Sequence, residues 1–98
     1  MTEEGIFLKS EGDAWYKRCK DALVPHVRED DMPVMLMRKH HIKMKKVLEI
    51  GSANGWRLEL LRQGAPRASY LGIDPSRSAV RDGIKMFPKI TLKRGVAS

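Results

Sequence analysis

The sequence predicts an α/β fold in which three parallel strands are joined by crossover helices and preceded by N-terminal helices. Residues 46–98 alternate short apolar runs with stretches of helical periodicity, in the order strand, helix, strand, helix, strand. Glycine and proline residues separate these segments. Because strands that are joined through a helix run parallel, this order predicts half of a doubly wound sheet.

The composition is that of a globular chain, and its 98 residues suffice for one small domain. No apolar run approaches the roughly 20 residues that cross a bilayer, and the N-terminus lacks the hydrophobic region of a secretory signal. Cys19 is the only cysteine, which excludes an intrachain disulfide and favours a reducing environment. We therefore expect a cytoplasmic protein without a membrane partner.

The net charge of +7 is unevenly distributed along the chain. Residues 1–31 hold five basic and eight acidic side chains, a balance of −3, whereas residues 32–98 hold fourteen basic and four acidic ones, a balance of +10. A basic surface attracts nucleic acid or other polyanions. The alternative is that a missing C-terminal portion carries the compensating acidic groups, because charge alone specifies no partner.

Residues 1–45 are expected to form a helical lead-in to the sheet. Asp13 is placed to cap a first helix, and Pro25 ends its pattern. The apolar face predicted for this helix consists of Trp15, Cys19, Ala22 and Leu23.

A second helix is expected to begin where Asp31 or Met32 precedes Pro33. Its predicted apolar face consists of Val34, Met37 and His41. The adjacent pair His40 and His41 cannot share the i, i+4 face that helical metal sites use, and no cysteine or acid lies at a ligand spacing. We therefore predict no metal site.

The elements of residues 46–98 follow one another closely. The apolar run at 46–50 predicts a strand that ends in a turn at 51–55. A helix follows, with Gly64 at its C′ position and Pro66 just beyond. Its apolar residues are Trp56, Leu58, Leu60 and Leu61.

A second strand is predicted at 69–74, and Pro75-Ser76 opens a second crossover helix that Pro88 stops. The alternation at 89–93 predicts a third strand. The residues of the second crossover helix that are expected to face inward are Ala79, Val80, Gly83, Ile84 and Phe87.

The first turn carries the features of a ligand site. Ligands of open α/β sheets bind beyond the carboxyl ends of the strands. Gly51 and Gly55 let a ligand approach the backbone, and the amides that open the next helix favour a carboxylate or phosphate. Glu49 is an acid within an apolar strand, so it needs a partner such as an ammonium group. Asp74, at the same edge, is placed to accept both hydroxyls of a ribose.

The spacing of this turn excludes a dinucleotide site. The fingerprint G-x-G-x-x-G requires glycine at 51, 53 and 56, and the sequence has Ala53 and Trp56 at two of these positions. A ligand with an amino acid end near Glu49 and Gly51 and a ribose at Asp74 fits better.

Two segments resemble the cofactor motifs of class I S-adenosylmethionine-dependent methyltransferases. The segment 47–55, Val-Leu-Glu-Ile-Gly-Ser-Ala-Asn-Gly, is similar to the first motif of that family, and the segment 70–76, Tyr-Leu-Gly-Ile-Asp-Pro-Ser, to the second. The resemblance implies a partial Rossmann-like methyltransferase fold, with its cofactor-binding half at 46–98 and S-adenosylmethionine as the cofactor.

The same resemblance assigns roles to individual residues. The glycine turn would hold the methionine part of the cofactor, Asp74 its ribose, and Glu49 would support the turn and the amino end. The family's middle glycine is replaced by Ala53. The implied cofactor-binding residues are Glu49, Gly51, Ser52, Ala53, Gly55 and Asp74.

Residues 10–18 resemble the lead-in of some bacterial members, in which an aromatic and polar segment folds over the cofactor. Tyr16 and Arg18 are the candidates for that contact. Family members also continue past the third strand with the residues that meet the methyl group and the substrate, so no catalytic residue can be named. We expect a truncated N-terminal fragment that is inactive alone. The open strand edge at 47–50 predicts self-association.

Two other classes of function remain open. One is a basic, non-enzymatic module that binds nucleic acid, and the other is a structural protein whose incomplete sheet pairs with a partner. A basic stripe on the outer face of the second crossover helix is either a solvated surface or a contact for RNA phosphates. This stripe consists of Arg77, Arg81 and Lys85.

Overall fold

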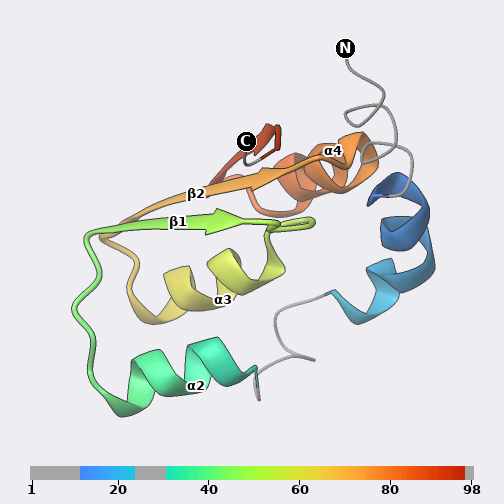
Figure 1. Cartoon of the computed structure of the whole chain (residues 1–98). Helices are drawn as coiled ribbons and strands as arrows, with labels where there is room; N and C mark the ends of the chain where they lie inside the picture. Colours follow the sequence, from blue (N-terminus) through green and yellow to red (C-terminus); the bar gives the residue numbers. More distant parts are fainter. Residues whose placement is uncertain (1–11, 24–30, 97–98) are drawn as a thin grey trace.

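The chain forms a three-stranded, all-parallel sheet with helices against it, which confirms the predicted fold class (Figure 1). In this computed structural model, residues 12–23 and 31–96 are described. The strand order is β1-β2-β3. The elements are a helix at 12–19, the 3₁₀ helix η1 (Lys20–Ala22), α2 (Met32–Lys39), β1 (Lys46–Ile50), α3 (Trp56–Gly64), β2 (Ser69–Asp74), α4 (Arg77–Met86) and β3 (Thr91–Arg94). None of the described helices is long and apolar enough to cross a membrane.

Both crossover helices pack on the same face of the sheet. The Tyr70 hydroxyl of β2 donates to the Leu61 carbonyl of α3 at 3.3 Å. On the neighbouring strand, the Leu92 side chain lies only 2.3 Å from where a Cβ at Gly83 of α4 would be. Gly72 pairs with Leu92 and is two residues from Tyr70, so all three strand positions point the same way.

The hydrophobic core lies between this face, the two crossover helices and the lead-in. It includes Val34, which is fully buried, and it is bordered by half-buried residues such as Met37 and Val47. Its buried members are Tyr16, Leu23, Val34, Ala53, Trp56, Leu58, Leu60, Leu61, Tyr70, Ala79, Val80, Phe87, Ile90 and Leu92.

Only part of the apolar face predicted for the first lead-in helix lies at the core, where Cys19 is half-buried against it. Trp15 is 45% exposed and Ala22 is exposed, whereas Tyr16 is buried. The Tyr16 hydroxyl donates to Asp82 of α4 at 3.0 Å, so this side of the helix has a polar partner inside the fold. Leu23, which was predicted to face inward, is buried.

Asp13 lies within the first helix, so the prediction that it caps this helix is wrong. Its carboxylate instead accepts hydrogen bonds from the Ser76 hydroxyl (2.5 Å) and the Ser78 amide (3.1 Å). These groups lie at the N-terminus of α4, where a negative charge is favourable. The predicted end of the first helix at Pro25 lies outside the described residues.

The second helix begins as expected and ends earlier. Asp31 is its N-cap, and its carboxylate accepts from the Val34 amide at 3.4 Å. His41 was predicted to lie on the apolar face, but it follows the helix in a left-handed conformation (φ 50°) and is exposed. The prediction for His41 is wrong because α2 ends at Lys39, two residues before it.

Three further details differ from the predictions. Gly64 is the last residue of α3, with Ala65 as the C-cap, rather than the C′ residue. Ile84 is 53% exposed instead of inward-facing. The third strand is displaced toward the C-terminus and spans Thr91–Arg94.

The close contact between α4 and the turn after β1 leads to a testable prediction about the stability of the fold. A Cβ at Gly83 would lie 2.2 Å from the backbone carbonyl oxygen of Asn54. We expect Gly83→Ala to lower the free energy of unfolding by about 2 kcal/mol or more, because overpacking forces the turn and helix apart.

Gly64→Ala is the matched control, because a Cβ there meets nothing within 4 Å. It should leave the free energy of unfolding unchanged or raise it by about 0.5 kcal/mol. Urea unfolding measures both variants, and equal stabilities would contradict the packing described here.

Candidate functional site

The carboxyl ends of β1 and β2 meet at one edge of the sheet. Ile50 pairs with Ile73 in parallel register, so Glu49 and Asp74 lie at the same end of neighbouring strands. The Gly51 amide donates to the Ile73 carbonyl at 2.7 Å and holds the turn against β2. The structure therefore brings the two predicted carboxylates and the glycine turn to one edge.

The turn at 51–55 contains three residues with positive φ. Gly51 (φ 77°) and Gly55 (φ 86°) adopt a conformation that side chains disfavour, and Ala53 (φ 52°) adopts it despite its methyl group. An added Cβ at Gly55 would lie 2.6 Å from Ile90 Cδ1, whereas one at Gly51 would meet nothing within 4 Å. Gly55 is therefore packed into the fold, and Gly51 borders open space.

Asp74 fastens this turn to the start of α4. It is 9% exposed, and its two oxygens accept from the amides of Ala53 (3.2 Å) and Ser76 (3.3 Å). Burial raises the pKa of the Asp74 carboxyl, and these two hydrogen bonds oppose that rise. A carboxylate has about four lone-pair positions, so Asp74 retains accepting capacity after both bonds are made.

Arg57 joins two acids that the chain holds far apart in sequence. Its Nε and Nη2 atoms donate to Asp31 at 2.8 and 2.9 Å, in the paired geometry that guanidinium favours, and its Nη1 donates to Glu49 Oε2. The hydrogen bonds that Arg57 donates to Asp31, followed by the one that it donates to Glu49, raise the pKa of Arg57 and keep it charged. The guanidinium also lies 4.8 Å from the centre of the Trp56 ring.

Glu49 has a second carboxylate oxygen, and this atom is the notable feature of the site. Oε1 is buried and has no hydrogen-bond partner among the described residues. Burial is the main reason why the pKa of Glu49 is raised; the Arg57 hydrogen bond opposes the rise, and the charges of Asp31 and Asp74 add to it. A buried oxygen without a donor is costly, and a ligand that carried a donor would relieve that cost.

The Ser52 hydroxyl oxygen, like Glu49 Oε1, is buried without a hydrogen-bond partner among the described residues, and it lies close to β2. Ser52 is 3% exposed, and its Oγ has no partner within the described part of the chain. A Cβ at Gly72 would lie 2.5 Å from this oxygen, so the absence of a side chain on β2 makes room for the turn.

The lead-in reaches the site through polar contacts. Asn54 donates from Nδ2 to the Leu23 carbonyl at 2.8 Å and accepts from the Trp56 amide at 3.1 Å. Trp56 is buried in the core. Tyr16, a candidate for covering a cofactor, is buried with its hydroxyl on Asp82, and burial first of all raises its pKa to about 12.

Sequence reasoning did not assign Arg57, Asp31 or Asn54 to this site. Glu49 carried a signal for Arg57, because an acid in an apolar strand demands a partner and Arg57 lies in the first turn of the helix that follows that strand. Asn54 also carried one, since asparagine is favoured where a helix starts. Across residues 12–23 and 31–96, no cluster of three or more His, Cys, Asp or Glu residues is arranged to hold a metal ion.

Two solved structures share the fold of this chain. They are crystal structures of the plantazolicin methyltransferase BpumL with SAH, one with a pentazolic and one with a triazolic desmethylPZN analog. Each matches with a TM-score of 0.52 and 19% sequence identity, over 95% of this chain and 42% of the other chain. The chain thus has a methyltransferase-like α/β fold and spans less than half the length of those proteins. No protein-family model and no curated protein matches it.

The Arg57 bridge makes a prediction about stability. Removing the guanidinium takes away the cation shared by two carboxylates whose side chains are only 5% (Asp31) and 14% (Glu49) exposed. We expect Arg57→Leu to lower the free energy of unfolding by about 3 kcal/mol, as is typical when one partner of a buried ion pair is lost.

Arg81→Leu is the control for this experiment, because the Arg81 side chain is 62% exposed and its distance to Asp82 is 4.0 Å. Its effect should stay below about 0.5 kcal/mol. Chemical denaturation at neutral pH measures both variants. Similar losses in the two would show that the bridge has no special role.

Proposed function

We propose that this chain is the S-adenosylmethionine-binding portion of a methyltransferase. The observation that carries the proposal is the buried Oε1 atom of Glu49, which has no hydrogen-bond partner among the described residues and belongs to a residue two positions before Gly51, where the turn borders open space. The sequence motifs at this edge and the methyltransferase-like fold support it. The residues that would bind the cofactor are Glu49, Gly51, Ser52, Ala53, Gly55 and Asp74.

The charges around the edge favour a cationic ligand. The charges of Asp31 and Asp74 both add to the raised pKa of Glu49, so the electrostatic potential that they create at this carboxyl is negative and favours a cationic ligand. The ammonium group of the cofactor would find an acceptor in Glu49 Oε1, with Arg57 holding the other oxygen in place. Bound S-adenosylmethionine would supply an electrophilic methyl group on its sulfonium centre.

The part of the site at the end of β2, where Asp74 lies, is suited to binding a ribose. Asp74 is held rigidly by two backbone amides and retains lone pairs for further hydrogen bonds. Its position one strand away from Glu49 separates the acceptor for an ammonium from the acceptor for hydroxyls. This arrangement fits an amino acid that is joined to a nucleoside.

For the 98-residue chain, the proposal is binding without methyl transfer. The matched methyltransferases are more than twice as long as the segment that this chain resembles. The groups that bind and position a methyl acceptor would then lie in the part of those proteins that has no counterpart in these 98 residues.

The proposal predicts pH-dependent binding of S-adenosylhomocysteine (SAH). An ammonium ligand favours ionised Glu49, whose pKa is raised in the free protein, so binding releases a proton and the affinity for SAH falls as the pH is lowered toward that pKa. Glu49→Gln should weaken SAH binding about tenfold or more at pH 7.5 and flatten this pH dependence. Isothermal titration calorimetry measures both effects.

Two controls make the experiment specific. Glu59→Gln changes another buried acid, one that is paired with Arg62 on α3, and should leave SAH affinity unchanged. Methylthioadenosine, which lacks the amino acid, should bind the wild type and Glu49→Gln equally. Equal SAH binding by all three proteins, or no binding at all, would overturn the proposal.

A further inference from the structure

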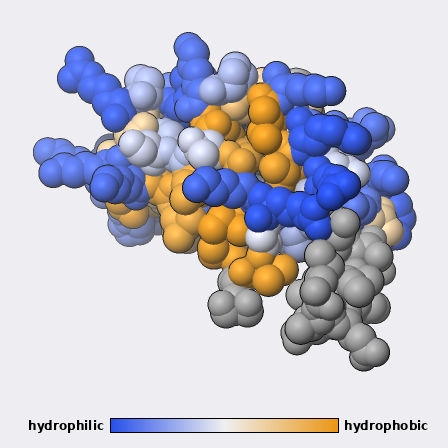
Figure 2. Space-filling model, turned by 90° about the horizontal axis from the view of Figure 1, so that it is seen from above, coloured by the Kyte–Doolittle hydropathy of each residue, from blue (hydrophilic) through white to orange (hydrophobic). Residues whose placement is uncertain are grey.

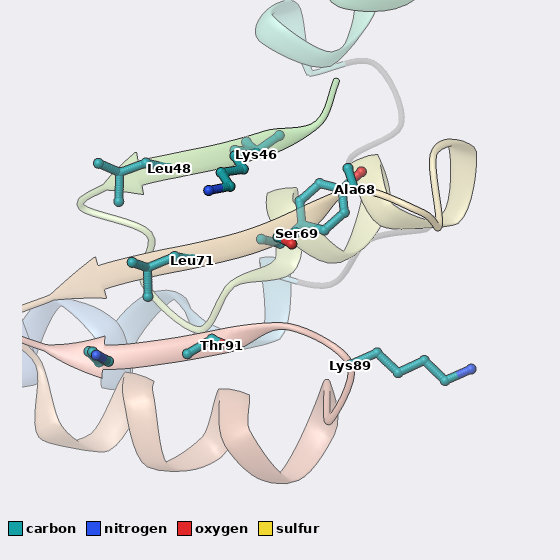
Figure 3. A pocket seen from close by; sticks show the side chains of 10 residues that line it. Lys46, Leu48, Ala68, Ser69, Leu71, Lys89 and Thr91 are labelled. Carbon is teal, nitrogen blue, oxygen red and sulfur yellow. The ribbon is translucent and has the colours of Figure 1, made fainter. Parts of the chain in front are cut away.

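The end of the molecule where the strands begin is basic. Lys46 opens β1 and pairs with Ser69 at the start of β2, and Lys89 precedes the first residue of β3 by two positions. Figure 3 shows these three residues at the same end of the strands, with the Lys89 side chain pointing away from the sheet. Arg67 lies in the loop that enters β2. Each strand therefore begins at a cation or shortly after one.

The end of α2 adds to this surface. A concavity of about 260 Å³ is lined by residues from the end of α2 and from the end of α3, among them Arg38 and Ala65. The end of α2 therefore lies beside the loop that enters β2. Further cations follow α2 in the loop to β1. The exposed cations of this end, here called the basic edge, are Arg38, Lys39, Lys43, Lys45, Lys46, Arg67 and Lys89.

Among the described residues, no acid lies within the basic edge. The segments 38–46, 65–68 and 87–90, all of them described, contain neither aspartate nor glutamate. Glu59 of α3 comes near, because the charge of Lys89 adds to a lowering of its pKa that comes mainly from hydrogen bonds with Arg62. Arg62, however, already donates to both Glu59 oxygens, at 2.6 and 2.7 Å. Figure 2, which views the molecule of Figure 1 from above, shows hydrophilic side chains projecting at the left end, where the strands begin.

Local structure explains only part of this charge. Cations in the last turn of a helix interact favourably with its dipole, which accounts for Arg38 and Lys39. The other five lie in loops or at the first residue of a strand, and the effect of a helix dipole falls off within the last turn. Like charges that gather without acids repel one another, and a bound polyanion would relieve this repulsion.

The side chains of the basic edge suit a nucleic acid duplex better than other polyanions. In the three segments, Ile42 is the only large exposed hydrophobic residue, and Phe87, the only aromatic one, is 8% exposed. Membrane surfaces are bound by several apolar side chains together with cations, and single strands stack on aromatic rings. A duplex needs neither, because it presents one phosphate charge per about 1.7 Å of its length. The distance from β1 to β3, about 10 Å, faces several of these charges.

We propose that the basic edge binds the phosphate backbone of a double-stranded nucleic acid, independently of base sequence. Phosphate contacts carry affinity, whereas sequence is read by side chains that reach the bases. The five residues of β1 separate this surface by about 16 Å from the strand ends that carry Glu49 and Asp74. The proposal therefore does not depend on cofactor binding.

The basic stripe on α4 is the rival surface. Its cations Arg77, Arg81 and Lys85 are also exposed. Asp82 approaches Arg81 to 4.0 Å, and the Asp13 carboxylate lies at the N-terminus of the same helix. Acids accompany this stripe, so its attraction for phosphates is weaker and it serves as the matched control.

The probe is a fluorescein-labelled DNA duplex of about 20 base pairs, and fluorescence anisotropy measures its binding to the 98-residue chain. Binding should be saturable and should weaken about 100-fold between about 50 and 200 mM salt, because four or more phosphate contacts release that many counterions. A second duplex of unrelated sequence should bind within about twofold, and a single strand of equal length should bind more weakly.

A triple substitution locates the binding. Lys45→Gln/Lys46→Gln/Arg67→Gln should weaken duplex binding about tenfold or more at low salt. It should also reduce the slope of log Kd against log salt concentration by about 2 to 3, since each lost phosphate contact removes about one unit. All three side chains are exposed, so the variant is expected to fold, and circular dichroism checks this.

Arg77→Gln/Arg81→Gln/Lys85→Gln removes the same net charge from α4 and should leave the affinity within about threefold and the salt slope unchanged. Equal losses in the two variants would show that net charge alone attracts the duplex, which would overturn the proposal. So would the absence of saturable binding at low salt, or tighter binding of the single strand. Tighter binding of vesicles that contain phosphatidylserine, or equal competition by polyglutamate and unlabelled duplex, would also overturn it.

Discussion

One guanidinium, Arg57, ties together the parts of the chain on which the site depends. It joins the N-cap of α2 to the acid of β1 from the first turn of α3. Without it, Asp31 and Glu49 would be neighbouring carboxylates in a largely buried place, and their repulsion would separate the lead-in from the sheet. Because Arg57 engages one oxygen of Glu49, the other remains for a ligand.

Much of the sheet could be predicted from the sequence, because its signals are local. The strand at 69–74 and the turn at 51–55 were delimited by apolar alternation and by glycine and proline. Parallel order then placed Glu49 and Asp74 at one edge, since the carboxyl ends of neighbouring parallel strands must coincide.

The remaining features depend on contacts between distant residues, which periodicity does not reveal. Asp31 and Arg57 are 26 residues apart, and Tyr16 finds its partner Asp82 66 residues away. Ile84 shows the limit of a helical pattern: Gly83 presses against the turn, and the next residue is rotated by about 100°, which places Ile84 at the solvent boundary. Sequence periodicity therefore predicts the buried face of a helix to within about one residue. The packing of the neighbouring elements determines which residues at the border of that face are buried.

The claim at the centre of this account is that Glu49 receives the amino group of an adenosyl amino acid. A crystal structure of the chain with SAH tests it most directly. The account predicts the ligand's nitrogen within hydrogen-bond distance of Glu49 Oε1 and the ribose hydroxyls on Asp74. A ligand bound elsewhere, or one whose amino group faces away from Glu49, would contradict it.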